Sequence, residues 1–135
     1  MSLTAIAVDD EPKALEVIQL HIEKIPFLDL KATFREATAA IAWLQEHQTD
    51  MVFLDINMPN LSGLRFRELA GPQQKIIFTT AYAEYAVESY QQQAVDYLLK
   101  PIQFPRFFQA VLKAKELIIR FYGFVFSEKF VHLKP

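Results

Sequence analysis

The chain has 135 residues, of which 52% are apolar and 22% are charged, and its formal net charge is −2. This length suits a single domain, and the apolar fraction allows a buried core. The small net charge gives no general attraction to nucleic acid or to an anionic membrane. The sequence has no cysteine, which excludes disulfides, cysteine-ligated zinc and thiol catalysis.

The N-terminal region shows no signal for export. The acidic residues Asp9, Asp10 and Glu11 come before the apolar region of a signal peptide could form. No uninterrupted apolar stretch approaches the ~18 residues that a membrane span needs. We therefore expect a soluble, cytoplasmic chain with no membrane segment.

Five apolar runs alternate with helical patterns along the chain. The run 51–54 has no polar interruption, as in a central parallel strand covered on both faces. The run 28–34 alternates with charge and suits a strand near the sheet edge. The other strands are expected at 5–8, 75–80 and 95–99. Five consecutive strand-then-helix units with short connections predict an α/β fold with a doubly wound parallel sheet.

The segments between the expected strands have the apolar spacing of amphipathic helices. The first opens at Pro12 and is closed by Pro26, and the second covers 37–44. A short helix follows the turn at 59–63 and stops at Gly71-Pro72. A further helix is expected around Tyr85, Ala86 and Tyr90, and the last opens at Pro105 and ends at Gly123.

The tail after Gly123 has a different pattern. Residues 124–126 and 130–133 are apolar runs on either side of Ser127-Glu128-Lys129, which is typical of a β-hairpin. A lone hairpin is only marginally stable in water. We therefore expect a first domain at 1–121, and a linker with the truncated start of a second domain at 122–135.

Polar residues stand where several of these strands end. Asp9 and Asp10 follow the first strand, Asp55 follows the third, Thr80 closes the fourth and Lys100 closes the fifth. In an open parallel sheet these ends share the edge at which ligands bind, so the side chains should meet in one pocket. Carboxylates, a hydroxyl and an ammonium suit a divalent cation and a phosphoryl group held together.

Each of these residues also has a plainer structural explanation. The acidic run 9–11 before Pro12 is typical of a helix N-terminus, where negative charge complements the helix dipole. Lys100 and Thr80 are residue types that often end a strand at the surface. Asp55 is harder to explain in this way, because burying a carboxylate beside Asp10 costs several kcal/mol unless a cation or hydrogen bonds offset the repulsion.

Taken in order, the motifs resemble the receiver domain of two-component response regulators. The match covers about residues 3–121. It rests on the segments Val8-Asp9-Asp10-Glu11-Pro12, Phe53-Leu54-Asp55-Ile56-Asn57-Met58-Pro59, Thr79-Thr80-Ala81-Tyr82 and Asp96-Tyr97-Leu98-Leu99-Lys100-Pro101. The resemblance implies a flavodoxin-like (βα)5 fold with strand order 2-1-3-4-5. The finer pattern is similar to the LytTR (LytR/AlgR) group, in which a DNA-binding β-domain follows the receiver.

The resemblance also implies roles for the matched residues. Asp55 would be the phosphoacceptor. Mg²⁺ would be held by Asp9, Asp10, Asp55 and the backbone carbonyl of Asn57. The phosphoryl group would be contacted by Lys100, Thr80 and the backbone N–H of Ala81. Thr80 and Tyr97 would form the switch pair, and Pro59 and Pro101 would shape the adjoining turns, with the bond before Pro101 a candidate for the cis form.

The implied partners are a sensor histidine kinase as phosphodonor and a second copy of the chain, which would associate on phosphorylation. DNA would be bound only through a C-terminal domain that is missing here. A haloacid-dehalogenase-like phosphatase is the main alternative, since it also combines an Asp nucleophile, a hydroxyl, a lysine and Mg²⁺. Its Asp-x-Asp motif has Asn57 in the second position here, and its acid pair comes last in the chain rather than first.

A second alternative is an interaction module that keeps the fold without being phosphorylated. The intact set of Asp10, Asp55, Thr80 and Lys100 argues against it. We therefore expect a phosphoacceptor switch rather than an enzyme with substrate turnover.

Overall fold

The computed structural model describes residues 2–59, 61–83 and 94–133, which form a sheet with helices on both faces. The strands are β1 (Leu3–Val8), β2 (Leu28–Phe34), β3 (Met51–Asp55), β4 (Lys75–Thr80) and β5 (Asp96–Leu99). The helices are α1 (Pro12–Glu23), α2 (Ala37–Leu44), α3 (Gly63–Ala70) and α5 (Phe104–Leu133). The helix expected around Tyr85, Ala86 and Tyr90 lies outside the described residues.

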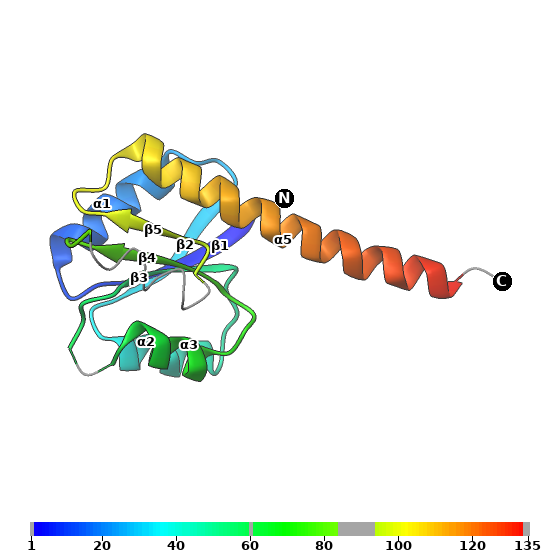
Figure 1. Ribbon diagram of the computed structural model, residues 1–135, viewed down its shortest axis with the longest axis horizontal. Coiled ribbons are helices and arrows are strands. Elements are labelled where there is room, and N and C mark those ends of the chain that lie inside the picture. The colour runs from blue at the N-terminus through cyan, green and yellow to red at the C-terminus, as the bar shows by residue number, and fades with distance from the viewer. Residues whose placement is uncertain (1, 60, 84–93, 134–135) are drawn as a thin grey trace.

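The five strands form one parallel sheet in the order β2-β1-β3-β4-β5. The doubly wound sheet and its strand order are therefore confirmed. Figure 1 shows α1 and α5 over one face of the sheet and α2 and α3 over the other. Because all the strands run the same way, the ends of β1, β3, β4 and β5 open at one edge.

Alternate strand residues build the two halves of the core, one on each face of the sheet. Ala5, Phe53 and Leu98 are buried on the side of α1 and α5. Ile6 and Val52 are buried on the side of α2 and α3. Burial on both faces explains why the β1 and β3 sequences are apolar without interruption.

The same alternation places the polar residues that follow the strands. Asp9 and Asp55 come two positions after Ala7 and Phe53, which face α1 and α5. Lys100 stands in the same relation to Leu98. These three residues are thus directed to the same side of the sheet edge, whereas Thr80 continues the opposite face, on which Ile76 and Phe78 are buried.

Local signals set the ends of the shorter helices. Pro12 opens α1, where its missing N–H leaves no hydrogen bond unmade, and Leu15, Ile18 and Ile22 then face the core at helical spacing. Ser62 caps α3, because its Oγ accepts a hydrogen bond of 3.1 Å from the backbone N–H of Arg65. Gly71 ends α3 with a φ of 87°, which an L side chain rarely adopts.

The tail is helical, and the predicted hairpin at 124–133 is wrong. The helix α5 runs for 30 residues from Phe104 to Leu133 and passes through Gly123 without a break. Figure 1 shows it leaving the domain as one straight element. One glycine costs a helix only ~1 kcal/mol relative to alanine, so it does not by itself end an established helix.

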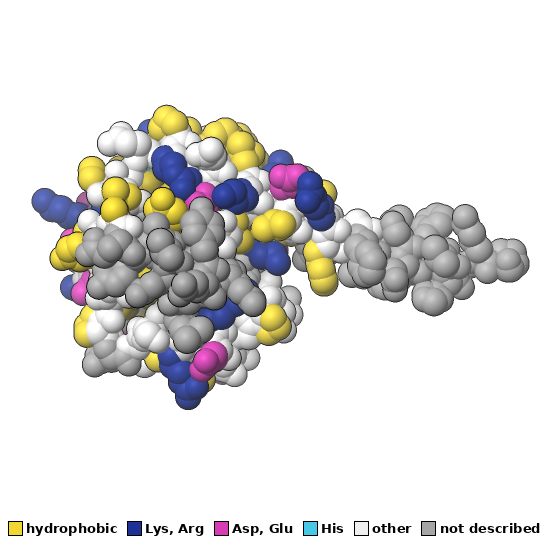
Figure 2. Space-filling model, viewed as in Figure 1, with side chains coloured by type: hydrophobic (Ala, Val, Ile, Leu, Met, Phe, Trp, Pro, Cys, Tyr) yellow, Lys and Arg dark blue, Asp and Glu magenta, His cyan; other side chains and the backbone are white. Residues whose placement is uncertain are grey.

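On the part of α5 whose side chains are described, apolar and charged groups are mixed. Leu112, Leu117, Ile119 and Phe121 are exposed, and Figure 2 shows apolar and charged side chains side by side where the helix leaves the domain. Among the described residues, the structure contains no helix that combines the length and the apolar character needed to cross a membrane.

Candidate functional site

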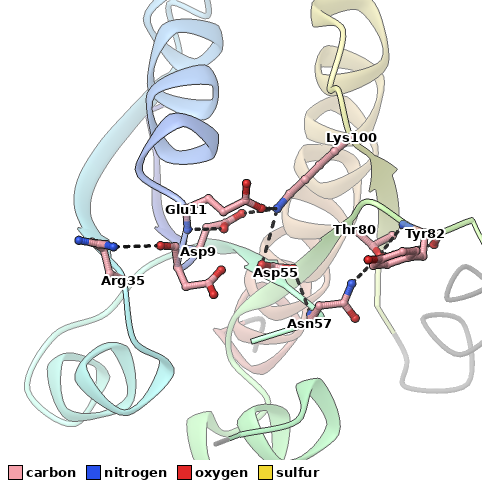
Figure 3. A network of polar contacts seen from close by, with 9 residues as sticks. Asp9, Glu11, Arg35, Asp55, Asn57, Thr80, Tyr82 and Lys100 are labelled. Carbon is pink, nitrogen blue, oxygen red and sulfur yellow. Dashed lines mark hydrogen bonds and ion pairs between the residues drawn. The ribbon is translucent and has the colours of Figure 1, made fainter. Parts of the chain in front are cut away.

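Four carboxyl groups meet at the C-terminal edge of the sheet. Asp9, Asp10, Glu11 and Asp55 each offer one oxygen, and these oxygens lie within 4.8 Å of one another. Asp9 and Asp55 are buried, whereas Asp10 and Glu11 are exposed. The structure thus brings the three predicted aspartates together, with Glu11 as a fourth acid. Figure 3 shows Asp9, Glu11 and Asp55 of this cluster around Lys100.

Lys100 places its ammonium group among these acids. Its Nζ lies 2.9 Å from Oδ2 of Asp9, 3.2 Å from Oε1 of Glu11 and 3.6 Å from Oδ2 of Asp55. Burial alone would lower the pKa of Lys100, but the hydrogen bond to Asp9 and the charges of Asp55 and Asp9 outweigh it, so the pKa is raised. The amine therefore stays protonated at neutral pH.

The backbone around Lys100 is also fixed. Its N–H donates to the carbonyl oxygen of Thr80 at 2.7 Å. The peptide bond between Lys100 and Pro101 is cis, the form for which the sequence made it a candidate.

Asp55 is a buried carboxylate with an altered acidity. Burial raises its pKa, and the charge of Asp9 adds to this effect. The backbone N–H of Asn57, which donates to Oδ1 of Asp55 at 3.0 Å, and the charge of Lys100 act in the opposite direction. The net result is a pKa of about 6, so most of the group is ionised, and therefore nucleophilic, at neutral pH.

The two adjacent aspartates have different surroundings. Both oxygens of Asp9 are engaged, since Oδ1 accepts from the backbone N–H of Glu11 at 3.0 Å and Oδ2 pairs with Lys100. Asp10 is exposed, and its backbone carbonyl accepts from the guanidinium of Arg35 at 3.3 Å. The contacts of Glu11 and Arg35 were not predicted from the sequence. Glu11 could have been included, because it directly follows the aspartate pair.

Thr80 is buried and is linked to the residues around it by its hydroxyl group. Its Oγ1 accepts from the backbone N–H of Tyr82 at 3.0 Å and from Nδ2 of Asn57 at 3.4 Å. The side-chain contact of Asn57 was not expected, because only its backbone carbonyl had been assigned a role. Ala81 is exposed directly after Thr80. Tyr97 is half-buried, and the guanidinium carbon of Arg106 lies 5.8 Å from its ring centroid.

A groove of about 700 Å³ lies beside the acidic cluster. Its lining includes Asp10, Arg35, Met58 and Pro59. It opens where the loops after β1, β2 and β3 come together. Because Asp10 lines the groove, the groove gives the acidic cluster an approach from solvent.

A second charged cluster lies on the side of Tyr97, and sequence reasoning missed it. Asp96 is buried, and its two oxygens accept hydrogen bonds of 2.7 and 2.8 Å from the guanidinium of Arg106. Lys113 lies 3.6 Å from the same carboxylate. Burial would raise the pKa of Asp96, but the hydrogen bonds from Arg106 and the backbone of Tyr97 hold it below its usual value. The pair joins β5 to the first turns of α5.

The sheet order and the acidic cluster define the class of protein. The chain belongs to the response regulator receiver domain family, whose model it matches over residues 5–112. An uncharacterized response regulatory protein of Yersinia pestis is 36% identical over 121 residues, which are 87% of this chain and 51% of that protein. The transcriptional regulatory protein BtsR of Escherichia coli is 31% identical over 116 residues, 84% of this chain and 48% of that protein. The chain thus spans about half the length of these relatives.

Solved structures agree with this assignment. The response regulatory domain of mrkE from Klebsiella pneumoniae has a TM-score of 0.76 and 30% identity, over 85% of this chain and 97% of that one. The REC domain of AraT from Geobacillus stearothermophilus has a TM-score of 0.74 and 30% identity, over 89% of this chain and 98% of that one. The predicted receiver fold is therefore confirmed.

The acidic cluster fits a hard divalent cation. Its carboxylate oxygens are the ligand type that Mg²⁺ prefers, and they are close enough together to share one ion. The ammonium of Lys100 carries one positive charge among four carboxyl groups, so it does not by itself balance the charge of the cluster. Receiver domains in general bind Mg²⁺ at an acidic pocket of this kind.

Proposed function

We propose that this chain accepts a phosphoryl group on Asp55 from a sensor histidine kinase or a small phosphodonor. The observation that carries the proposal is the position of Asp55: a buried carboxylate at the end of β3, 3.6 Å from the ammonium of Lys100 and next to further acids. Receiver domains are in general phosphoacceptor switches, which supports this role.

In the proposed transfer, a carboxylate oxygen of Asp55 attacks the phosphorus atom of a phosphohistidine. The P–N bond breaks, its electron pair returns to the imidazole nitrogen, and an acyl phosphate forms on Asp55. Lys100 neutralises negative charge on the phosphoryl oxygens, and the N–H of Ala81 and the hydroxyl of Thr80 contact them. Attack by water on phosphorus later restores the carboxylate and releases inorganic phosphate.

A divalent cation would add to this charge neutralisation. We propose that Asp9, Asp10, Asp55 and the backbone carbonyl of Asn57 hold Mg²⁺. When bound, Mg²⁺ would supply a further positive charge at the phosphoryl oxygens. The engaged oxygens of Asp9 and the exposed carboxylate of Asp10 suggest that Asp10 gives the more direct contact.

The proposed change of conformation on phosphorylation would begin at the hydroxyl group of Thr80. Its hydroxyl is held by Asn57 and Tyr82 in this structure, and a phosphoryl group on Asp55 would offer it a charged acceptor instead. Turning of Thr80 would leave room for Tyr97 to move inward. We propose that the changed surface then pairs two copies of the chain. This surface comprises β5, α5 and the helix expected around Tyr85, Ala86 and Tyr90, which lies outside the described residues.

Sedimentation tests this coupling without a labile phosphate. Beryllofluoride with Mg²⁺ should strengthen a concentration-dependent dimer of the wild type and should have no effect on Thr80→Ala. An association state that is the same with and without beryllofluoride would remove the dimer from the proposal and leave the phosphorylation of Asp55 standing.

We propose that the parent protein is a cytoplasmic transcriptional regulator of the LytTR group. One relative is named a transcriptional regulatory protein, and the chain covers 48% of it. DNA would then be bound by a domain outside this chain. The boundary between a receiver at 1–121 and a linker with the start of that domain at 122–135 remains a prediction, and the hairpin no longer supports it, because α5 crosses the boundary.

We propose a switch with self-catalysed phosphotransfer and dephosphorylation rather than an enzyme with turnover. The phosphatase alternative is not favoured, because the chain matches the receiver family over residues 5–112. A generic phosphate ester incubated with the protein and Mg²⁺ should not be hydrolysed above the rate of the buffer.

Intact mass spectrometry after incubation with acetyl phosphate and Mg²⁺ tests the phosphoacceptor. The wild type should gain one phosphate, and Asp55→Asn should gain none. Asp29→Asn, which changes an exposed aspartate of β2, is the matched control and should label like the wild type. Labelling that persists in Asp55→Asn would overturn the assignment.

A further inference from the structure

His21 connects α1 to the loop that follows Lys100. Its Nε2 lies 2.8 Å from the carbonyl oxygen of Ile102, across 81 positions of sequence. The ring also packs against α5, with its centroid 5.5 Å from that of Phe104 and 5.2 Å from that of Phe107. A polar side chain is therefore held within an apolar contact between α1 and α5, two helices that lie together in Figure 1.

The contact with Ile102 fixes which ring nitrogen carries the proton. A carbonyl oxygen can only accept, so Nε2 of His21 is the donor. The other nitrogen, Nδ1, is buried without a hydrogen-bond partner among the described residues. The contact that Nε2 donates to Ile102 is therefore the hydrogen bond by which His21 joins α1 to this loop.

That bond is made next to the lysine of the proposed site. On one side, the N–H of Lys100 is held by the carbonyl of Thr80 at 2.7 Å. On the other side, the chain is held by His21 at Ile102, whose own side chain is buried. These two hydrogen bonds hold the backbone of residues 100–102 at both ends and so fix the position of the Cα atom of Lys100.

We propose that His21 is a positioning residue for phosphoryl transfer, which fixes Lys100 through the carbonyl of Ile102. This inference rests on the proposed phosphorylation of Asp55. His21 touches none of the acids itself, so its effect passes through the backbone of residues 100–102. The Nζ of Lys100 lies 2.9 Å from Asp9 and 3.6 Å from Asp55. A shift of the Lys100 backbone would change both distances. Misplacement of a reacting group by 1 Å can cost ~10²-fold in rate.

Two substitutions separate the hydrogen bond from the packing. His21→Leu places an apolar side chain of similar size in this contact and removes the donor. His21→Gln keeps an N–H donor at about the reach of Nε2. The initial rate of labelling by acetyl phosphate with Mg²⁺ should fall about tenfold in His21→Leu and return to within about threefold of the wild type in His21→Gln. Equal rates in the wild type and His21→Leu would overturn the proposal.

A double-mutant cycle tests whether the effect passes through Lys100. In a Lys100→Ala background, His21→Leu should cause no further loss of rate. A tenfold loss in that background as well would show general damage to the fold and would overturn the positioning role. His47→Leu is the matched control, because His47 also bonds a backbone carbonyl, that of Trp43 at 3.0 Å, and lies exposed just after the end of α2. It should label at the wild-type rate.

A measurement on the unphosphorylated protein separates this inference from the proposed function. The ¹⁵N spectrum of the His21 ring at about pH 8 should show the neutral form with the proton on Nε2. If the proton is found on Nδ1 instead, Nε2 cannot donate to the carbonyl of Ile102, and the proposal is overturned. If the wild type shows the expected tautomer but is never labelled, then the phosphoacceptor function fails and the anchor between α1 and Ile102 stands.

Discussion

Lys100 is paired more closely with Asp9 than with Asp55. The Nζ atom lies 2.9 Å from Oδ2 of Asp9 and 3.6 Å from Oδ2 of Asp55, with Oε1 of Glu11 at 3.2 Å. The single ammonium is therefore shared among three carboxylates, and Asp55 receives the weakest share by distance. Of these three carboxylates, Asp55 is the one whose charge Lys100 compensates least.

The first prediction concerns stability against pH. The pKa of Asp55 is about 6 in the folded chain, above its ordinary value of 3.8. As pH rises between these values, the unfolded chain loses this proton first, so ionisation of Asp55 destabilises the metal-free fold. Asp55→Asn should therefore be more stable than the wild type by about 1–2 kcal/mol above pH 7; the favourable charge of Lys100 is already included in the pKa of Asp55. The difference should vanish near pH 4.

Urea unfolding in a metal chelator, at several pH values, measures this difference. Asp29→Asn serves as the control, because Asp29 is exposed on β2. A stability difference between Asp55→Asn and the wild type that does not change with pH would contradict the prediction.

The second prediction concerns Mg²⁺. Asp10→Ala should weaken Mg²⁺ binding by roughly tenfold or more and slow phosphorylation in parallel, because it removes an exposed carboxylate from the cluster. Asp9→Ala should have the smaller effect on Mg²⁺, since the oxygens of Asp9 already accept from Glu11 and pair with Lys100. Calorimetric titration with MgCl₂ measures both affinities. Unchanged Mg²⁺ affinity in Asp10→Ala would exclude this residue as a ligand.

The third prediction concerns Asp96 and Arg106. The pKa of Asp96 lies below its usual value, because hydrogen bonds from Arg106 and the backbone of Tyr97 outweigh the cost of burial. This contribution to stability is present above the unfolded pKa of 3.8 and is lost as pH falls through the lower folded pKa. Arg106→Gln should cost about 2–3 kcal/mol at pH 7, less than for a fully buried pair because the Arg106 side chain is 38% exposed.

Thermal or urea unfolding at pH 7 and below pH 4 tests this prediction. The cost of Arg106→Gln should shrink in acid, because a protonated Asp96 no longer needs the guanidinium. Arg120→Gln is the control, since Arg120 and Glu116 form an exposed pair on α5 that should contribute less than ~1 kcal/mol. A cost that stays the same in acid would show that Arg106 acts through packing alone.

The fourth prediction compares two adjacent threonines of β4. Thr79 and Thr80 are both buried, but the hydroxyl of Thr79 has no hydrogen-bond partner among the described residues, whereas that of Thr80 bonds Tyr82 and Asn57. Thr79→Val should stabilise the fold by about 1 kcal/mol, because it removes an unsatisfied polar group at nearly constant volume. Thr80→Val should destabilise it by a similar amount. Urea unfolding measures both, and a loss of stability in Thr79→Val would point to a water bound at that hydroxyl.

The apolar runs predicted most of the fold. The sequences of β1 and β3 carry their own signal, because strands buried on both faces need no polar side. The meeting of Asp9, Asp55 and Lys100 could also be predicted, since parallel strands bring their C-terminal ends to one edge. These predictions depend on the direction and order of strands and not on the detailed packing of side chains.

Contacts between elements of different kinds were harder to predict. The pairing of Asp96 with Arg106 and of His21 with Ile102 depends on where α5 and α1 lie across the sheet, which no local pattern sets. The hairpin prediction for the tail was wrong for another reason. Short apolar runs such as 124–126 suit a strand or a helix equally. The helix prevails because it extends an existing one and needs no new nucleation.

Because α5 is continuous, a small tilt of the helix near the site would displace its far end by a larger distance. The helix starts at Phe104, beside the loop that carries Lys100, and reaches Leu133 without interruption. At 1.5 Å per residue, such a helix is about 45 Å long. A tilt of about 5° at the end next to the site would move the far end sideways by about 4 Å. If α5 moves as one rigid helix, a displacement smaller than one bond length near the sheet becomes a movement about the size of a side chain at its C-terminal end.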